Sequence, residues 1–481
     1  MSSRPRHPAL AATLSFLFPG LGQAYAGQRE IALLLGVPIL LMIAGGLVVA
    51  SVLGERLRNQ VFSSEFLAGL LILDLALLGW RLYAIAHAGI SATGVRRAGR
   101  RVLAAVGVLL LLTVAMHAYA GWVIGSLDSA LNQVFSGATG GITSPAGAEP
   151  PPAPINRPTY RWDGTERVNF LLLGVDSAPG REDALTDTIL VVSVDPVADQ
   201  AVMVSIPRDT GFMPLPDTRI YADGLYPNKI NQLTTEAQES PELWCPDLED
   251  PQECGIRSLE RTVGLYLGIE IHHYASVDLA GFARLIDAMG GVELCLPGML
   301  SDPYYYDGEH GIALGQGCFV RTGPQALAFA RIRSGVMVME DGNFVFQDDF
   351  MRAARQQEVL LAIREELASA DTFLELPGLL DAIGRTVQTD FPRDRAGDLA
   401  SLLPLITAPN IERSVLGLPR FVDPPVDPVA NYLLIPLRDA IRAEAERLFG
   451  GDGPLVGWYV GSDAATPDEA AIEGVHDSVD D

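Results

Sequence analysis

The hydrophobic residues of this chain form two patterns, long unbroken runs near the N-terminus and short bounded runs later. Three runs are close to the roughly 20 residues that cross a bilayer, at residues 31–53, 66–88 and 102–125. Arginines lie before the first run, in "RPRHP", and between the second and third, in "GVRRAGRR". Because positive flanks stay in the cytoplasm, the pattern predicts a membrane region at residues 1–125 with about three transmembrane helices.

An earlier apolar segment, residues 9–27, is shorter and is interrupted by Pro19 and several glycines. It predicts an interfacial or re-entrant piece, with a fourth span as the alternative. It is not a cleavable signal peptide, because further spans follow it. Within the second span, we expect Asp74 to pack against a neighbouring helix and Arg81 to reach the cytoplasmic face.

After the membrane region, composition divides the chain further. Residues 126–167 are rich in Gly, Ser, Ala and Pro, which is typical of a linker. Residues 451–481 are acidic and poor in aromatic residues, which predicts a disordered tail. Residues 168–450 lie between them and are long enough for one large folded domain, on the outer side of the membrane.

Within residues 168–450, short apolar runs alternate with helical periodicity. The runs "RVNFLLLGVDS", "DTILVVSVDP" and "QAVMVSIPRD" predict strands, and "DPVADQ" joins the last two as a hairpin. Helices are expected at "SLERTVGLYLGI", "LAGFARLIDAMGG", "GPQALAFA" and "DDFMRAARQQEVLLAIREELAS". Further helices are expected in residues 374–406, and "ERSVLGLP" is expected to return to the sheet. This alternation predicts an α/β domain with layers packed on a mixed sheet.

Charge and cysteine content narrow the function. The formal net charge of -25 argues against a general nucleic-acid binder, because a phosphate backbone would be repelled. All four cysteines lie outside the predicted spans, and an even number in an oxidising compartment indicates disulfides. We expect the pairs Cys245–Cys254 and Cys295–Cys318. A zinc site is the alternative, but no CxxC or nearby Cys/His pair supports it.

Arginines recur in patterns that place them together. Arg208 follows the third strand directly after Pro207, and its neighbour Asp209 is expected to orient it. Arg331 and Arg333 would share a face if their stretch is extended. On a helix, one stripe would contain Asp349, Arg352, Arg355 and Gln356. Surface ion pairs would explain any one cluster. Together, these planar cations indicate a pyrophosphate site, because each binds phosphate oxygens in bidentate fashion.

Two carboxylates are available for a divalent cation beside that site. Asp176 ends the first strand and Asp187 begins the second. Mg²⁺ takes few protein carboxylates and completes its shell with phosphate oxygens and water, so the pair predicts a magnesium site. The alternative is ordinary turn and capping chemistry, for which aspartate is often used.

Taken together, these segments resemble the LytR-CpsA-Psr family of bacterial cell-envelope proteins. The resemblance covers about residues 168–420, through "NFLLLGVDS", "TDTILVVSVDP", "VSIPRDT", "KIN", "DLAGFARLIDAMGGVELCLP", "TGPQALAFARIR" and "DFMRAARQQ". It implies an αβα domain with a hydrophobic cavity for a polyprenyl chain, behind a membrane anchor. It also implies transfer of a glycopolymer, with its linking phosphate, from a polyprenyl pyrophosphate carrier to peptidoglycan.

The resemblance also implies roles for single residues. Asp176 and Asp187 match the family's Mg²⁺-binding acids, and Asp349 matches an acid near the reacting centre, as a proton acceptor or an orienting group. The pyrophosphate-contacting set is matched by Arg208, Arg331, Arg333, Arg352, Arg355 and Gln356. We expect catalysis to depend on Arg208, Arg331, Arg333 and Asp349.

The resemblance implies a multi-pass cell-membrane protein with an extracytoplasmic catalytic domain. Its partners would be a polyprenyl-pyrophosphate-linked glycopolymer, a peptidoglycan acceptor and membrane lipid, with no nucleic acid. Two other functions use the same residues or the same cavity: hydrolysis of the lipid pyrophosphate, and non-catalytic lipid binding by an envelope regulator. One departure is Leu185, where many members carry an arginine; Arg181 in the preceding loop is the candidate to replace it.

Overall fold

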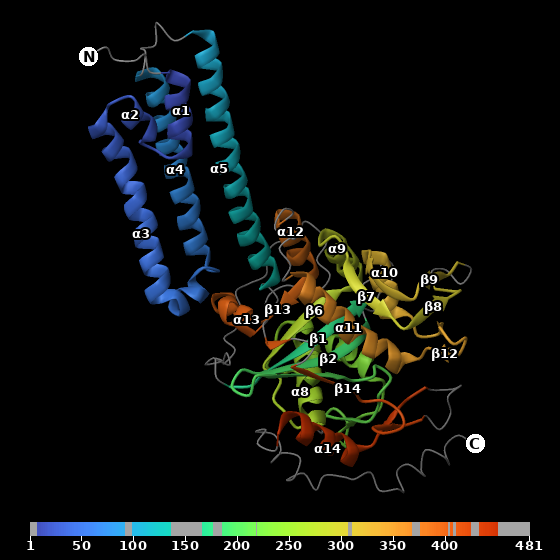
Figure 1. The fold of residues 1–481 in the computed structure, drawn as a ribbon. Helices are drawn as coiled ribbons and strands as arrows, with labels where there is room; N and C mark the ends of the chain where they lie inside the picture. The colour runs from blue at the N-terminus through green and yellow to red at the C-terminus, as the bar shows by residue number, and fades with distance from the viewer. Residues whose placement is uncertain are drawn as a thin grey trace, which may run out of the picture. The chain divides into compact units, whose positions relative to one another are not determined.

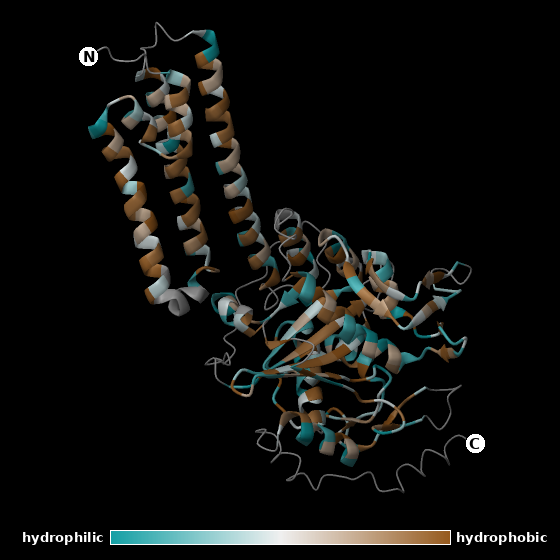
Figure 2. Ribbon diagram, viewed as in Figure 1, coloured by the Kyte–Doolittle hydropathy of each residue, from teal (hydrophilic) through white to brown (hydrophobic). Residues whose placement is uncertain are grey.

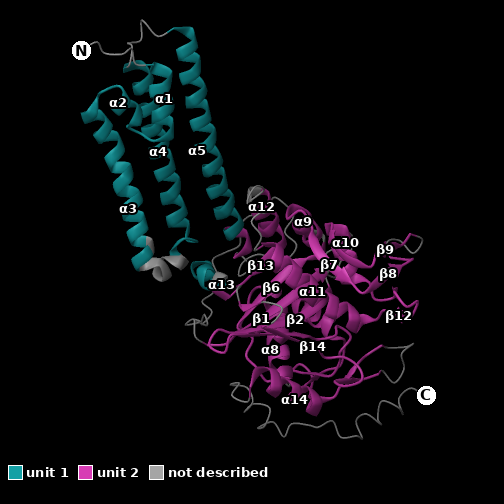
Figure 3. Ribbon diagram, viewed as in Figure 1, with its two compact units in different colours: residues 1–131, 392–399 teal, residues 132–391, 400–481 magenta. Residues whose placement is uncertain are grey.

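The computed structural model describes residues 7–91, 99–135, 166–176, 185–217, 219–305, 310–367, 376–402, 405–406, 410–424 and 432–450. The chain divides into two compact units, residues 1–131 with 392–399 and residues 132–391 with 400–481 (Figure 3). Arg181, the side chain of Asp176, linker residues 136–165 and the predicted tail lie outside the described residues.

The first unit is a helical bundle. Its helices are α1 (Pro8–Leu17), α2 (Leu21–Tyr25), α3 (Arg29–Gln60), α4 (Ser64–Ser91) and α5 (Arg100–Val134). Among the described residues, three stretches are apolar and long enough to cross a membrane: Arg29–Val49, Ser64–Ser91 and Arg100–Val134 (Figure 2). The segment expected to be interfacial forms the short helices α1 and α2, which turn at Gly20 with φ 99°.

Helix α5 differs from the expected third span, because it continues as helix to Val134. The first residues of the predicted linker, 126–134, are therefore helical. Their sequence "SLDSALNQV" holds no proline or glycine, so nothing in it ends the helix.

Two charged side chains within the apolar helices contact neighbouring helices. Asp74 lies 2.7 Å from Nδ1 of His117 in α5, which confirms that it packs against another helix. Arg81 donates from Nη2 to the backbone oxygen of Phe16 in α1, at 2.8 Å. Because an unpaired polar group is costly in hydrocarbon, these contacts hold α1, α4 and α5 together.

The second unit is built on a six-stranded sheet with the order β13-β6-β1-β2-β3-β14 (Figure 1). The strands are β1 (Val168–Asp176), β2 (Leu185–Asp195), β3 (Gln200–Ser205), β6 (His273–Asp278), β13 (Val387–Thr389) and β14 (Ile411–Val415). The pairs β1–β6 and β3–β14 are parallel and the others are antiparallel. The sheet is therefore mixed, and it contains the expected β2–β3 hairpin.

Helices cover both faces of this sheet. One face packs into a core with α6 (Leu233–Glu239), α8 (Pro251–Leu267) and α14 (Arg438–Phe449), through residues such as Leu171, Val191 and Leu259. The other face is covered by α9 (Leu279–Ala288) and α11 (Asp349–Leu367), beside α10 (Gly323–Arg331) and α12 (Leu376–Thr386). The domain thus has the expected αβα layers.

Two smaller sheets extend the second face. One pairs β7 (Val292–Leu296) with β10 (Gly317–Arg321). The other has the order β12-β11-β8-β9 and contains β8 (Gly298–Asp302), β9 (Ile312–Leu314), β11 (Val336–Met339) and β12 (Phe344–Phe346). The short elements that remain are β4 (Met213–Pro214), β5 (Leu225–Tyr226), η2 (Ile230–Gln232), α7 (Pro241–Trp244), η4 (Arg393–Arg395), α13 (Ala396–Leu402), β15 (Val422–Asp423) and β16 (Ile435–Pro436).

Both expected disulfides are confirmed. Cys245–Cys254 joins the end of α7 to α8 inside the main core, and Cys295–Cys318 links partner positions of β7 and β10. All four cysteines are paired, so the zinc alternative is excluded for them. Each bond closes a loop of the second unit.

Candidate active site

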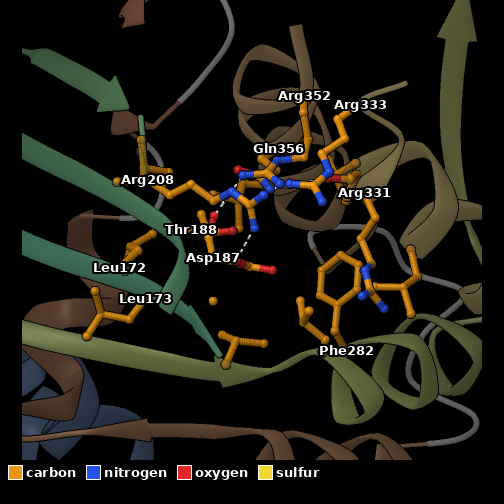
Figure 4. A pocket seen from close by; sticks show the side chains of 18 residues that line it. Leu172, Leu173, Asp187, Thr188, Arg208, Phe282, Arg331, Arg333, Arg352 and Gln356 are labelled. Atoms are coloured by element: carbon orange, nitrogen blue, oxygen red, sulfur yellow. Dashed lines mark hydrogen bonds and ion pairs between the residues drawn. The ribbon is translucent and has the colours of Figure 1, made fainter. Parts of the chain in front are cut away.

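A cavity of about 230 Å³ lies between the second face of the sheet and α9, α10 and α11. Its two ends differ in chemistry (Figure 4). The polar end contains Asp187, Thr188, Arg208, Arg333, Arg352 and Gln356, whereas Arg331 lies beside Phe282. The apolar end carries Leu172, Leu173 and Phe282 (Figure 4), and the further apolar residues of the lining are Leu190, Val277, Leu279, Leu327, Val359 and Leu360. One cavity can therefore hold an anionic group and a hydrocarbon at once.

Asp187 reaches the cavity because β2 contains a β-bulge. Gly174 of β1 pairs with Thr188, but its neighbour Val175 pairs with Thr186, so Asp187 is the extra residue. A bulge turns a side chain that the normal alternation would send to the other face. Here Asp187 and Thr188 both line the cavity. Glycine is required at position 174, opposite Thr188, because a Cβ there would lie only 2.7 Å from Oγ1 of Thr188.

Arg208 and Arg352 meet two carboxylates at the polar end. Arg208 donates from Nη1 to Oδ1 of Asp187 at 2.6 Å, and its Nε lies 3.6 Å from Oδ1 of Asp349. Arg352 lies 3.1 Å from the same Asp349 oxygen and donates to the backbone oxygen of Asp187 at 3.0 Å. The third strand, the bulge and the first turn of α11 are thus joined at one point.

Hydrogen-bonding capacity remains at this point. The Nε atoms of Arg208 and Arg352 and Oδ1 of Asp349 are buried, and none has a hydrogen-bond partner among the described residues. Buried donors without partners are costly. A phosphate oxygen would satisfy donors of this kind, so the arrangement is suited to an anionic ligand.

Burial changes the acid–base behaviour of the cluster. It raises the pKa of the Asp349 carboxyl above its usual range, against the opposing effect of Arg352 and Arg208. It also lowers the pKa of Arg352. Burial opposes the charge of Arg208 too, but the ion pair with Asp187 outweighs it and the pKa of Arg208 is raised. Asp349 therefore takes up a proton at a higher pH than an ordinary aspartate does.

Arg331 and Arg333 enter the cavity from the C-terminal end of α10 rather than from a strand. Arg331 is the last residue of the helix, and Ile332 leaves the helical conformation with ψ 127°. Arg333 follows in the turn, and its guanidinium approaches those of Arg208 and Arg352, while Arg331 lies beside Phe282 (Figure 4). The stretch is not a strand, but both side chains line the same cavity, as the sequence led us to expect.

Arg355 is placed differently from the other arginines. It is 5% exposed and does not line the cavity. Its Nε donates to the backbone oxygen of Phe329 at 2.7 Å, and its two Nη atoms donate to the backbone oxygen of Ile332 and to Oε1 of Gln347. We call Arg355 and these three acceptors the clamp. The neighbouring Gln356 does line the cavity and donates to the backbone oxygen of Ala330 at 3.2 Å.

Burial lowers the pKa of Arg355 to about 10. The residue stays protonated at neutral pH, and its charge is met by three acceptors of the protein itself. Because those acceptors lie at the end of α10 and beside α11, Arg355 fixes the backbone that carries Arg331 and Arg333. Its place in the structure favours positioning over contact with pyrophosphate.

Lys229 and Tyr432 were not assigned a role from the sequence. Lys229, which is the only lysine of the chain, lies 2.8 Å from Oδ1 of Asp209 and 5.8 Å from the ring centre of Tyr432. Asp209 in turn lies 3.9 Å from Nε of Arg208. The one signal in the sequence that could have singled out Lys229 is that it is the only lysine among many arginines. Together these groups form a second layer behind Arg208.

One described carboxylate that suits a hard divalent cation, that of Asp187, lies at the strand ends. Asp187 presents a carboxylate to the cavity from the bulge, and the backbone of Asp176 pairs with Leu185 at the same end of the sheet. Carboxylate oxygens are suitable ligands for Mg²⁺. Asp187 is shared with Arg208, however, so a cation there would compete with that ion pair. In the described part of the chain, one cluster holds three possible metal ligands, Glu293, Cys295 and Cys318, and it is not a metal site because its sulfurs form a disulfide.

Comparison with known proteins identifies relatives of this domain. Residues 148–418 match the model of the LytR_cpsA_psr family. The chain is 26% identical over 350 residues to a polyisoprenyl-teichoic acid–peptidoglycan teichoic acid transferase TagU of Halalkalibacterium halodurans, covering 72% of this chain and 97% of that protein. It is 31% identical over 234 residues to the TagU of Oceanobacillus iheyensis, covering 48% and 61%. Among solved structures, B. subtilis TagV is 22% identical with a TM-score of 0.43, covering 59% and 97%.

Proposed function

The chain belongs to the LytR-CpsA-Psr family, and from this premise we propose that it transfers a glycopolymer from a polyprenyl pyrophosphate carrier to peptidoglycan. The observation that carries the proposal is the single cavity with an arginine-rich end and an apolar end. A polyprenyl pyrophosphate has the same two parts, a diphosphate and a hydrocarbon chain. Teichoic acid is the polymer named for the relatives in two bacteria, and the polymer moved by this chain is of the same general class.

The binding roles follow from position in the cavity. Arg208, Arg333 and Arg352 bind the diphosphate oxygens at the polar end, Gln356 completes that end, and Arg331 adds a cation to the same cavity. The hydrocarbon lies along Leu173, Phe282 and Leu360 toward the other end. Guanidinium groups suit this task because they stay charged and offer paired donors to phosphate.

The chemical step is transfer of a phosphoryl group that carries the glycan. The hydroxyl oxygen of the acceptor attacks the phosphorus attached to the glycan, and the bond from that phosphorus to the bridging oxygen breaks. Polyprenyl phosphate leaves with the bonding electrons. Asp349 accepts the hydroxyl proton, and the arginines stabilise the charge that develops on the phosphate oxygens. The raised pKa of Asp349 supports this role, since a proton acceptor works best with a pKa nearer to the working pH.

Magnesium dependence is part of the same proposal. Asp176 and Asp187 would hold the ion, and a bound Mg²⁺ supplies positive charge next to the diphosphate oxygens. Asp187 would then be shared between the ion and Arg208. Chelation followed by Mg²⁺ addition tests this: we expect transfer to be lost and restored in the wild type, with a much weaker response in Asp187→Asn.

We further propose that the protein is a multi-pass membrane protein with its catalytic domain outside the cytoplasm. The three apolar helices and the arginines between the second and third support this orientation. The two disulfides of the second unit support an oxidising compartment.

Transfer can be separated from its two alternatives in one assay. The full chain in lipid nanodiscs is incubated with a polyprenyl-pyrophosphate-linked oligosaccharide and peptidoglycan fragments. A joined glycan–peptidoglycan product is the expected result. Free glycan phosphate without the joined product would mean a hydrolase, and lipid binding without turnover would mean a regulator.

A further inference from the structure

One sheet of the second unit has an apolar face that the described residues leave open. In the sheet of β12, β11, β8 and β9, Phe344 pairs with Val338 and Val338 pairs with Met299, while Phe346 pairs with Val336. These five side chains share one side of the sheet, and we call them the outer face. Phe346 is 80% exposed, Phe344 66% and Met299 43%.

The opposite side of the same sheet is the side that packs into a core. Leu300 pairs with Met337 and alternates with the outer residues. Leu300 is fully buried in the second core, and Met337 packs against it. A strand that is apolar on both sides of a sheet normally has both sides covered. Exposed aromatic residues gathered on one face indicate a binding surface.

Short stretches of chain join the outer face to residues at the polar end of the cavity. Val336 follows Arg333 by three residues, and Phe346 precedes Asp349 by three residues. Three residues span at most about 11 Å of extended chain. Strands β11 and β12 form an antiparallel hairpin. Gln347 closes the base of this hairpin, because its backbone nitrogen donates to the backbone oxygen of Gly335 at 2.9 Å. The side chain of Gln347 also accepts from Arg355. The clamp thus fixes the hairpin relative to the catalytic arginines.

We propose that the outer face binds the glycan strand of the acceptor and presents its hydroxyl to the polar end of the cavity. This inference rests on the proposed function, because it requires a polymeric carbohydrate acceptor. The acceptor is too long to enter the cavity and must pass over the surface beside it. The faces of sugar rings carry C–H groups, which pack against the electron-rich faces of aromatic rings. Phe344 and Phe346, two residues apart on β12, offer two such rings on the same side of the sheet.

Charge and size argue against two other occupants. The turn of the hairpin carries the exposed acids Glu340 and Asp341, and a hairpin that inserted into a bilayer would bring these charges toward hydrocarbon, which is costly. A stable protein partner usually covers about 20–30 residues on each side, whereas the outer face contributes five. A carbohydrate strand needs only a narrow aromatic track.

The test compares acceptor use by matched variants of the full chain in nanodiscs. Phe344→Ala/Phe346→Ala removes both rings. Phe319→Ala is the control, because Phe319 is 52% exposed on β10, in the other small sheet. With peptidoglycan fragments as acceptor, we expect the double variant to raise the acceptor KM about tenfold, which corresponds to about 1.4 kcal/mol. The donor KM should be unchanged, and Phe319→Ala should resemble the wild type. An unchanged acceptor KM in the double variant would overturn the proposal.

A second measurement keeps this inference separate from the proposed reaction. Binding of peptidoglycan fragments to the full chain is measured without donor, so no turnover is needed. Weaker binding by the double variant than by Phe319→Ala supports the outer face even if transfer is never seen. Equal binding by both variants contradicts it even if transfer is confirmed. A Phe346→Trp variant whose added fluorescence is quenched by brominated lipid would show a membrane contact and would also contradict it.

Discussion

Arg352 and Arg355 stand three residues apart on the same helix, yet they belong to different regions of the molecule. Arg352 lies at the polar end of the cavity, between Asp349 and the backbone oxygen of Asp187. Arg355 belongs to the clamp, where its donors are used by the oxygens of Phe329, Ile332 and Gln347. Both are 5% exposed. Both residues are arginines, equally buried and on one helix. The difference therefore shows that the acceptors around a buried arginine decide its function.

The largest effect is expected at the polar end. Arg208→Ala removes the donor that meets Asp187 and faces the diphosphate, so we expect kcat/KM for transfer to fall about 10³-fold. The thermal midpoint should fall as well, because the partly buried Asp187 carboxylate loses its partner, so turnover is compared at a temperature where the variant is folded. The exposed Arg219→Ala serves as the control. Near-normal turnover by a folded Arg208→Ala would place the diphosphate elsewhere.

Substitution in the clamp is expected to lower the stability of the protein more than its transfer activity. Arg355→Ala leaves several buried acceptors without a donor, so we expect a loss of about 3 kcal/mol of unfolding free energy, measured by denaturant titration. Arg355→Lys should not restore it, because one ammonium cannot reach three fixed acceptors. The exposed Arg385→Ala, at an i,i+4 surface pair, should cost less than about 1 kcal/mol. If Arg355→Ala abolished transfer at unchanged stability, the two regions would not differ as described.

A smaller effect is expected at Asp349, which lies beside Arg208 and Arg352. Burial raises the pKa of its carboxyl above the usual range. If the ionised form accepts the proton, transfer must fall as the pH drops through this raised pKa, at a higher pH than for an ordinary aspartate. Asp349→Asn should lower kcat about 10²-fold and lose this acid limb. An unchanged pH–rate profile in the variant would exclude Asp349 as the proton acceptor.

Much of this arrangement could be predicted from the sequence. The strands β1 to β3, the helices α8 to α11 and both disulfides follow from apolar periodicity, turn residues and cysteine number. The strand β6 (His273–Asp278) and the short β13 were not predicted, because each is brief and lacks a clear alternation. Tertiary pairing with β1 decides β6 instead.

The candidate site was predictable as a set of residues but not as a geometry. The helical spacing places Asp349, Arg352 and Arg355 on one face, and that face covers about a third of the circumference of the helix. Only the position of α10 shows that Arg355 faces backbone oxygens while Arg352 faces the cavity. The bulge at Asp187 depends on the register between β1 and β2, and no local sequence signal fixes that register.

The most direct test of the central claim is a structure of the protein with a polyprenyl pyrophosphate bound. We predict that the diphosphate contacts Arg208, Arg333 and Arg352, that Arg355 keeps its three acceptors, and that the hydrocarbon lies along Phe282 and Leu360. A diphosphate bound away from these arginines, or a lipid chain outside the cavity, would contradict the account.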